Sequence, residues 1–187
     1  PPKSIEALTT RVEIACQVSD ALAYIHDLGI IHRDLKPDNV MLEGEHSFLM
    51  DFGLAKARDS QWQMLTRAGD VLGTAAYMSP EQIQGHTLDT RSDVYAFGCL
   101  LYWLCTNQAP FAGKTLPELM NAHVAQPPEM PSSINPLVPA DLDALIVRLL
   151  AKDPSARYQR ADDVRFALRA CRRSLETLTS TASGIET

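Results

Sequence analysis

Apolar residues recur every three or four positions near the start of the chain, which is the spacing of one face of an α-helix. The repeat runs from Ser4 to about Leu28 and is followed by Gly29. Serine is favoured at the N-terminal cap of a helix, and glycine commonly ends one. The pattern therefore predicts a long amphipathic first helix that is capped by Ser4 and stopped by Gly29. Its apolar positions are Ile5, Leu8, Val12, Ala15, Leu22 and Ile25.

Two short apolar runs follow this helix and predict a small β-hairpin. They begin at Val40 and Phe48, and a polar turn, Glu43 to His46, separates them. From Asp51 to Pro80 no hydrophobic period is sustained, so the sequence predicts a loop of about 30 residues. Loops of that length in a compact domain are usually functional or disordered.

Helical patterns return in the second half of the chain. The run SDVYAFGCLLYWLC is almost entirely apolar, which is typical of a helix buried on most sides. Thr115 and Glu118 have the spacing of a capping box, which predicts a short helix that ends near His123.

The last third of the chain predicts a loop, two helices and a tail. The segment QPPEMPSSINPLVP is rich in proline and predicts a loop. DLDALIVRLLAK and ADDVRFALRACRRSLETL predict helices, and the second has acidic residues in its first turn and basic residues later, as the helix dipole favours. The closing residues TSTASGIET are small and polar and predict a frayed end or a linker.

Length and composition fit one core or one large lobe of a larger protein. The 187 residues are 45% hydrophobic, and 17 Lys and Arg against 23 Asp and Glu give a formal charge of −6. No basic stripe with interleaved aromatic residues is present, so nucleic acid is not an expected partner. No apolar run approaches the roughly 18 residues that span a bilayer, so no membrane contact is expected from this segment. The opening PPKSIEALTT has no initiator Met or signal sequence, which suggests a piece of a longer protein.

The cysteines indicate a reducing compartment. All four are isolated within apolar helical patterns, so we expect buried free thiols. They are Cys16, Cys99, Cys105 and Cys171.

The stretch IIHRDLKPDNVML places polar groups among apolar ones, and phosphate chemistry explains them. Phosphoryl transfer needs a carboxylate that orients the attacking hydroxyl, oxygen ligands for magnesium and a cation near the phosphoryl group. Asp34, Lys36, Asn39 and Asp51 supply these groups. The spacing puts Asp34 and Asn39 at two ends of one tight loop stiffened by Pro37, and the hairpin returns the chain so that Asp51 can approach Asn39.

The chain resembles the eukaryotic-type protein kinases. HRDLKPDN followed by DFG resembles their catalytic loop and magnesium motif, and GTAAYMSPEQ resembles the end of their activation segment. RSDVYAFGCLLYWL resembles the buried helix that follows, and DPSARY the motif with a late arginine. The sequences of these motifs are similar to those of bacterial Ser/Thr kinases.

This resemblance implies a fold and its boundaries. We expect a mainly α protein-kinase-like C-terminal lobe with short β-hairpins at the catalytic cleft. The lobe would cover residues 1–173, and residues 174–187 would form a polar C-terminal tail or linker. No G-x-G-x-x-G motif precedes Ser4, so the N-terminal β lobe is absent from this chain.

The resemblance also assigns chemical roles, with ATP and Mg²⁺ as cofactors. Asp34 would be the catalytic base, Lys36 the phosphate contact, and Asn39 and Asp51 the magnesium ligands. Met41, with Leu100 and Leu104 behind it, would form the apolar floor under adenine.

Structural roles follow from the same resemblance. Thr74 would line the substrate-recognition loop and bond towards Asp34 and Lys36. Glu81 should pair with Arg157 in a buried brace. The remaining residues assigned to structure are His32, whose backbone Asp93 should hold, and Phe52 and Gly53 of the magnesium motif.

Arg33 suggests control by phosphorylation. In kinases of this pattern it points towards the activation segment, where this chain offers only Asp59 and Asp70 as acidic partners. A phosphate there could take a bidentate bond from Arg33. Thr66 is the first expected phosphosite and Ser60 the second.

Three functions remain open at this point. The first is a cytoplasmic Ser/Thr kinase, or the cytoplasmic part of a membrane-anchored one, that acts on protein substrates and has its missing N-terminal lobe upstream. The second is a noncatalytic pseudokinase or scaffold. The third is a small-molecule phosphotransferase of the aminoglycoside or choline type, which shares the His-x-Asp-x-x-x-x-Asn loop but lacks the Ser-Pro-Glu element and the Asp93 helix.

Overall fold

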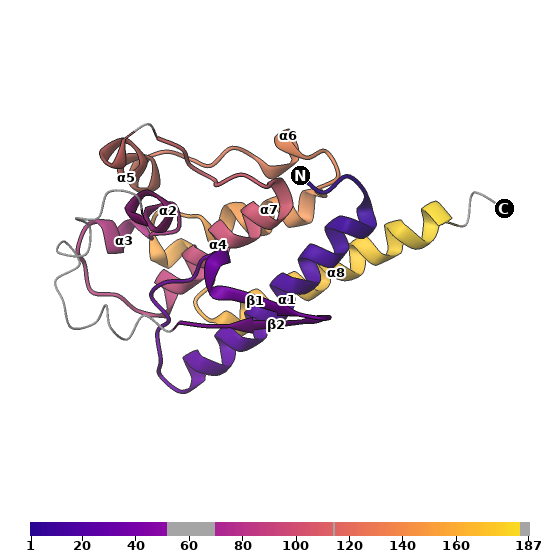
Figure 1. The fold of residues 1–187 in the computed structure, drawn as a ribbon, viewed down its shortest axis with the longest axis horizontal. Helices are drawn as coiled ribbons and strands as arrows, with labels where there is room; N and C mark the ends of the chain where they lie inside the picture. The colour runs from indigo at the N-terminus through magenta and orange to yellow at the C-terminus, as the bar shows by residue number, and fades with distance from the viewer. Residues whose placement is uncertain (52–69, 114, 184–187) are drawn as a thin grey trace.

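The computed structural model describes residues 1–51, 70–113 and 115–183, which form a helical body with a small hairpin on one side (Figure 1). The first helix, α1, spans Ile5–Asp27. The Ser4 hydroxyl oxygen accepts a hydrogen bond from the Ala7 amide at 3.1 Å and so caps the helix. Gly29 ends it with φ of 73°, a conformation that a side chain would strain. The predicted first helix is confirmed.

The predicted hairpin is also present. After the short 3₁₀ turn η1 (Pro37–Asn39), strands β1 (Val40–Glu43) and β2 (His46–Leu49) pair antiparallel, with Val40 opposite Leu49. Gly44 in the turn has φ of 60°. This pair is the sheet within the described residues.

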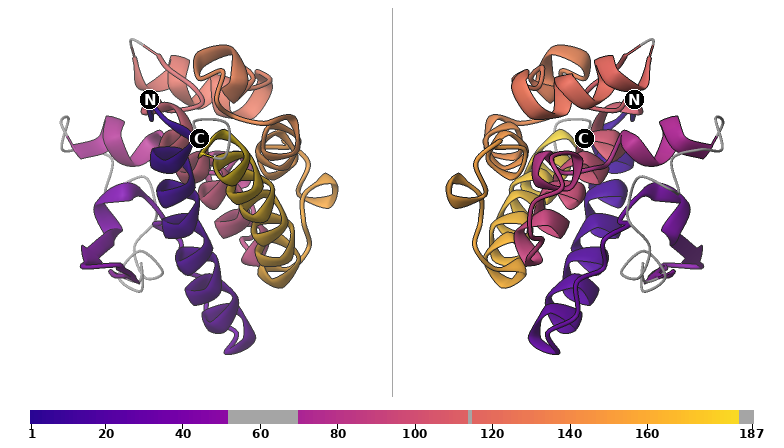
Figure 2. Two further views of the ribbon diagram at one scale, coloured as in Figure 1. Left: turned by 90° about the vertical axis from the view of Figure 1, so that its right-hand side faces the viewer. Right: turned by 90° about the vertical axis from the view of Figure 1, so that its left-hand side faces the viewer.

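A glutamine on α1 fastens the hairpin to the helical body. The Gln17 amide nitrogen donates to the Glu45 carbonyl at 2.9 Å, and its amide oxygen accepts from the Ser47 amide at 2.6 Å. The hairpin lies on the opposite side of α1 from the C-terminal helix (Figure 2). It therefore holds a fixed position beside the polar loop that precedes it.

Two short helices lie at the end of the predicted loop and directly after it. Residues 52–69 lie outside the described residues, but α2 occupies Asp70–Ala75 and α3 occupies Pro80–Ile83. The prediction of a continuous loop from Asp51 to Pro80 was therefore wrong at its end. A helix of six residues that contains Gly73 is too short to show a hydrophobic period, which explains the error.

Helix α4 (Thr90–Thr106) runs through the centre of the body (Figure 1). The Asp89 carboxylate caps it by accepting from the Arg91 amide at 2.9 Å. A Cβ atom added at Gly98 would lie 2.7 Å from the Leu149 Cβ, so glycine permits the close approach of α7 (Ala140–Leu149). The buried apolar run read from the sequence is this helix.

The segment between α4 and α7 contains two more helices. Thr115 caps α5 (Leu116–Ala125) by accepting from the Glu118 amide at 3.4 Å, as the spacing predicted. The proline-rich stretch predicted as a loop contains the four-residue helix α6 (Pro131–Ile134), so that prediction was wrong over these residues. Proline is tolerated in a first helical turn because its missing amide hydrogen has no partner there.

The last helix, α8 (Ala161–Ser183), follows the turn η4 (Pro154–Ala156) and lies alongside α1 (Figures 1 and 2). Ion pairs join the two helices, including Arg169 to Asp20 at 2.8 Å. The helix continues beyond residue 178 into the segment TSTASGIET, which was predicted to be a frayed end or a linker. Hydroxyls near this end bond to carbonyls one turn back, such as Ser180 to Glu176 at 3.0 Å.

One apolar core joins α1, α4, α7 and α8. Leu8, Tyr95, Leu101 and Ile146 are fully buried in it. The four cysteines are buried and free, as predicted. No described helix combines the length and apolar character needed to span a bilayer.

Candidate active site

His32 lies at the centre of the polar loop with 0% exposure. Its Nε2 donates to the Met50 carbonyl at 3.0 Å, and its Nδ1 accepts from the Asp34 amide at 3.3 Å. One ring nitrogen therefore acts as a donor and the other as an acceptor, which is the pattern of a neutral imidazole. The ring joins the loop that carries Asp34 to the strand end that leads into Asp51.

Asp93 on α4 holds the backbone of the same loop. Its carboxylate accepts from the His32 amide at 2.7 Å and from the Arg33 amide at 2.8 Å. This is the contact that the family resemblance led us to expect. The third partner, the Nε2 of His26 at 2.8 Å, was not predicted, because a single histidine near the end of a helix carries no pattern.

Arg33 adopts a left-handed backbone conformation with φ of 68°. For a residue with a side chain this costs about 1–2 kcal/mol. Hydrogen bonds on both sides stabilise it, because the Arg33 amide donates to Asp93 and its carbonyl accepts from the Gln82 side chain at 3.1 Å. Gln82 was missed from the sequence, although the Ser79-x-x-Gln82 spacing is a capping-box signature, and the structure has that box at α3.

Asp34, Lys36 and Thr74 form one cluster. The Lys36 ammonium lies 3.4 Å from the Asp34 carboxylate and donates to the Thr74 hydroxyl at 3.1 Å. Their positions in the cluster are partly open to solvent, since the Asp34 and Lys36 side chains are 14% and 18% exposed. The structure thus brings the expected base, the expected cation and the start of the expected substrate loop together.

Asn39 closes the loop opposite Asp34. Its side-chain nitrogen donates to the Asp34 carbonyl at 2.7 Å and to the Asp34 carboxylate at 3.3 Å. Its own carbonyl accepts from the Met50 amide at 2.9 Å, which brings the chain to Asp51. Asp51 is exposed and left-handed, with φ of 53°.

The family implies magnesium, and the donor set suits it. An amide oxygen from Asn39 and a carboxylate from Asp51 are hard oxygen ligands, and magnesium in such sites keeps waters and phosphate oxygens as its other ligands. No group of three or more His, Cys, Asp or Glu able to hold a metal occurs among the described residues.

Other predicted site residues fall outside this cluster or outside the described residues. Met41 lies on β1 with 42% exposure, whereas Leu100 and Leu104 are buried in α4. The remaining four, which lie in the segment 52–69 that is outside the described residues, are Phe52, Gly53, Ser60 and Thr66.

Glu81 and Arg157, 76 positions apart, form the expected pair. The two guanidinium end nitrogens donate to the two carboxylate oxygens at 2.7 and 2.9 Å. The Glu81 and Arg157 side chains are 9% and 0% exposed, and the Ser92 hydroxyl donates to the Glu81 carboxylate at 2.8 Å. Burial alone would raise the pKa of the Glu81 carboxyl, but the hydrogen bond and charge of Arg157 outweigh it and lower that pKa below its ordinary value. The pair joins α3, at the end of the segment that carries Thr74, to the helical body.

The loop brings together the carboxylate, the cation and the amide side chain that phosphoryl transfer requires. The protein kinase domain family matches residues 3–166. The chain belongs to this family, and its mainly α architecture is that of the C-terminal lobe.

Two serine/threonine-protein kinases are similar to this chain in sequence. A probable serine/threonine-protein kinase of Streptomyces coelicolor is 42% identical over 161 residues, which cover 86% of this chain and 24% of that protein. Serine/threonine-protein kinase PknB of Mycobacterium tuberculosis is 41% identical over 158 residues, which cover 84% of this chain and 25% of PknB. The chain therefore spans about a quarter of the length of these relatives.

A solved structure agrees in fold. The crystal structure of a mutant of the Mycobacterium tuberculosis PknI kinase domain matches with a TM-score of 0.64 and 24% identity. The match covers 91% of this chain and 56% of that one.

Proposed function

We propose that the chain is the C-terminal lobe of a Ser/Thr protein kinase, which transfers the γ-phosphoryl group of ATP to Ser and Thr hydroxyls of protein substrates. The observation that carries the proposal is the cluster of Asp34, Lys36, Asn39 and Thr74. The names of the relatives support the substrate class. The enzyme works in the cytoplasm, where ATP and Mg²⁺ are supplied, either free or as the cytoplasmic part of a membrane-anchored protein.

Asp34 acts as the catalytic base by accepting the proton of the attacking hydroxyl. Its carboxylate is suited to this role because the Asn39 amide and the Lys36 ammonium hold it in one orientation. Lys36 lies between Asp34 and Thr74, so its positive charge is directed to the place where the phosphoryl group and the substrate hydroxyl would meet. Thr74 positions the substrate loop against this lysine.

Asn39 and Asp51 would hold magnesium, which would neutralise charge on the phosphates of ATP. Met41 provides the apolar surface under adenine from its exposed place on β1, with Leu100 and Leu104 in the core of the lobe.

The hairpin has exposed apolar residues that would form a docking surface for an N-terminal lobe. Met41 and Phe48 are cross-strand partners on one face of the hairpin with 42% and 45% exposure, and Met50, two positions after Phe48, is 37% exposed. Grouped exposed apolar residues mark surfaces that another body covers. We infer that the N-terminal lobe of the same kinase, with its Gly-rich loop and strand lysine, covers this one.

The test uses the full-length protein, with both lobes. Asp34→Asn keeps the shape of the side chain and removes the proton acceptor, so kcat should fall by about 10² or more while the affinity for ATP changes little. Asp38→Asn is the matched control, because Asp38 is an exposed carboxylate in the same loop and should leave kcat near normal.

A second variant tests the metal. Asp51→Asn should raise the magnesium concentration needed for half-maximal activity, because it replaces an anionic carboxylate ligand with a neutral amide oxygen. Near-normal turnover in both Asp34→Asn and Asp51→Asn would contradict the assigned roles. ATP binding without measurable turnover in the unchanged protein would favour the pseudokinase alternative.

A further inference from the structure

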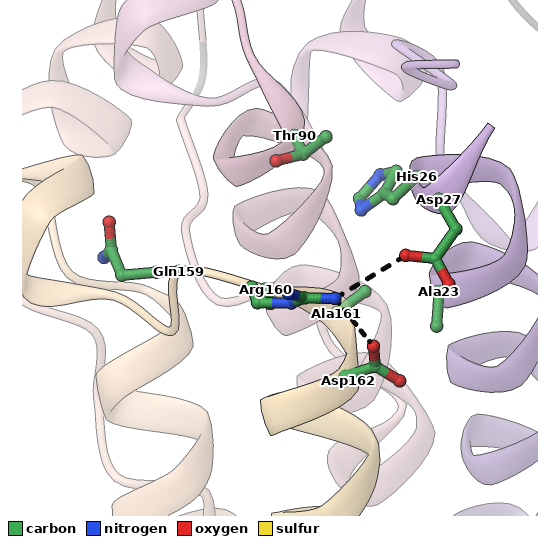
Figure 3. Close-up of a pocket in the computed structure, with 8 residues that line it drawn as sticks. All are labelled: Ala23, His26, Asp27, Thr90, Gln159, Arg160, Ala161 and Asp162. Carbon is green, nitrogen blue, oxygen red and sulfur yellow. Dashed lines mark hydrogen bonds and ion pairs between the residues drawn. The ribbon is translucent and has the colours of Figure 1, made fainter. Parts of the chain in front are cut away.

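A cavity of about 170 Å³ lies at a junction of helices (Figure 3). The C-terminal end of α1 forms one wall with His26 and Asp27, and Thr90 at the start of α4 also lines the cavity. The segment that enters α8 forms the other wall with Arg160 and Asp162. For scale, an engineered cavity of about 150 Å³ holds a benzene molecule.

His26 gives this cavity an unused hydrogen-bonding group. Its side chain is 7% exposed, and its Nε2 lies 2.8 Å from the Asp93 carboxylate. Within the described parts of the chain, the other ring nitrogen, Nδ1, is buried and has no hydrogen-bond partner. The Asp93 carboxylate, which accepts from two backbone amides, also accepts from the Nε2 of His26. When the ring is neutral its proton therefore lies on Nε2, and Nδ1 has a lone pair.

Two carboxylates add acceptors on the rim. Asp27 and Asp162 both face one guanidinium nitrogen of Arg160, at 3.7 and 3.3 Å, and Figure 3 shows the Arg160 side chain reaching across the cavity between them. The other Asp162 oxygen, Oδ1, is paired with Arg165 at 2.7 Å, so Oδ2 is the oxygen of Asp162 that faces Arg160. The Arg160 side chain is 67% exposed, and ion pairs of this kind contribute little stability. Arg160 can therefore leave the cavity for solvent at low cost.

The acceptors together define a ligand class. Two carboxylates and an imidazole lone pair suit a group that carries positive charge and several N–H donors. We propose that this cavity is a binding site for a small organic cation of the guanidinium or primary ammonium type, with Asp27 and Asp162 taking the charge and His26 Nδ1 accepting one hydrogen bond. In the structure Arg160 occupies part of this site and acts as an internal competitor.

An anion is a poorer match to the same walls. Arg160 and the nearby helix starts would attract it, but Asp27 and Asp162 would repel it. His26 would also need a second ring proton to donate from Nδ1.

The site is adjacent to the catalytic loop. The Asp93 carboxylate oxygen that faces His26 also accepts the His32 amide, so two hydrogen bonds connect the cavity to the backbone before Asp34. Binding of the cation does not depend on the proposed kinase activity. The test therefore reads binding directly and can fail or succeed whether or not the protein transfers phosphate.

The experiment titrates the full chain with methylguanidinium chloride at constant ionic strength and follows the ¹⁵N resonances of the His26 ring by NMR. We expect a saturable shift of Nδ1 with a dissociation constant on the order of millimolar, as for a ligand of few atoms. Asp27→Asn and Asp162→Asn should each weaken binding by about two- to fivefold. Arg160→Ala should tighten it, because the internal competitor is gone.

Asp163→Asn is the matched control. Asp163 lies next to Asp162 in the first turn of α8 but is exposed and does not line the cavity, so its loss should leave binding unchanged. No saturable Nδ1 shift, equal weakening in Asp163→Asn, or weaker binding in Arg160→Ala would each overturn the proposal. A shift caused by inorganic phosphate and lost in Arg160→Ala would also refute it and identify an anion site.

Discussion

Replacing Arg157 with alanine should lower the free energy of unfolding by about 3–5 kcal/mol, the usual cost of leaving one partner of a buried ion pair without the other. Glu81 would then keep its carboxylate among buried groups with the Ser92 hydroxyl as a remaining donor. The chain has about 190 residues, so each kcal/mol lost corresponds to about 2–4 °C in Tm. The expected decrease in Tm is therefore at least about 6 °C.

The hydrogen bonds of Arg157 explain why the upper half of this range is expected. Besides its two bonds to Glu81, the guanidinium donates to three backbone carbonyls at 2.7, 2.9 and 3.0 Å. These carbonyls belong to Ala151, Arg91 and Lys152, so the side chain joins the start of α4 to the segment after α7. Alanine leaves all of these acceptors without this donor, and each buried group left unpaired costs about 1–3 kcal/mol.

Two further variants separate charge from hydrogen bonding. Changing both Glu81 and Arg157 to methionine removes the lone buried charge, so it should destabilise less than Arg157→Ala, although the three carbonyls still lose their donor. Glu81→Gln keeps the shape of the acceptor. Because the folded-state pKa of Glu81 lies below its ordinary value of 4.5, its stabilising effect is present above pH 4.5 and is lost as the pH falls through the folded-state pKa. The stability difference between the unchanged chain and Glu81→Gln should therefore shrink below pH 4.5.

The assay is equilibrium unfolding in urea, with Arg160→Ala as the control. Arg160 also forms ion pairs, but its side chain is 67% exposed, so its loss should cost no more than about 1 kcal/mol. If Arg157→Ala shifted the midpoint no more than Arg160→Ala does, the pair would not be a buried brace and the reasoning would be wrong.

Three other predictions concern the pH dependence of stability, nucleotide binding and regulation by phosphorylation. Burial, followed by the charge of Lys152, lowers the pKa of His123 from 6.5 to about 3. The stability that the neutral ring gives above pH 6.5 should therefore be lost as the pH falls towards 3. In urea unfolding, His123→Gln should lose less stability than the unchanged chain over that range. The chain without an N-terminal lobe should not bind ATP·Mg²⁺ with low-micromolar affinity in calorimetry, because contacts to adenine and phosphates are missing; such binding would contradict the two-lobe account. In the full-length kinase, mass spectrometry should find phosphate between Asp51 and Thr74, and Thr66→Ala should reduce activity with the fold intact. A fully active enzyme without phosphate in that segment would refute regulation by phosphorylation there.

The long elements could be predicted from the sequence because their hydrophobic periods are long and their ends carry standard caps. The first helix, the hairpin and the buried α4 follow from Ser4, Gly29 and the apolar runs. Helices α2 and α6 could not, because six and four residues are too few to show a period. The extension of α8 to Ser183 was also missed, since Ser and Thr are weak helix formers.

The site also contains features that could be predicted from the sequence and features that could not. The cluster of Asp34, Lys36 and Asn39 is local in sequence, so its spacing alone indicates its chemistry. The pair of Glu81 and Arg157 could be predicted only through the family resemblance, because tertiary packing brings the two residues together. The hydrogen bond from His26 to Asp93 had no signal of either kind, since it joins isolated residues of two helices.

The central claim is that this lobe belongs to an active kinase for protein Ser and Thr hydroxyls. The most direct measurement incubates the full-length protein with ATP labelled at the γ-phosphate, Mg²⁺ and a protein substrate, followed by phosphoamino acid analysis of that substrate. We expect label on serine or threonine, and its loss in Asp34→Asn. Label confined to tyrosine or to a small-molecule hydroxyl, or no transfer by an unchanged protein that binds ATP and Mg²⁺, would contradict it.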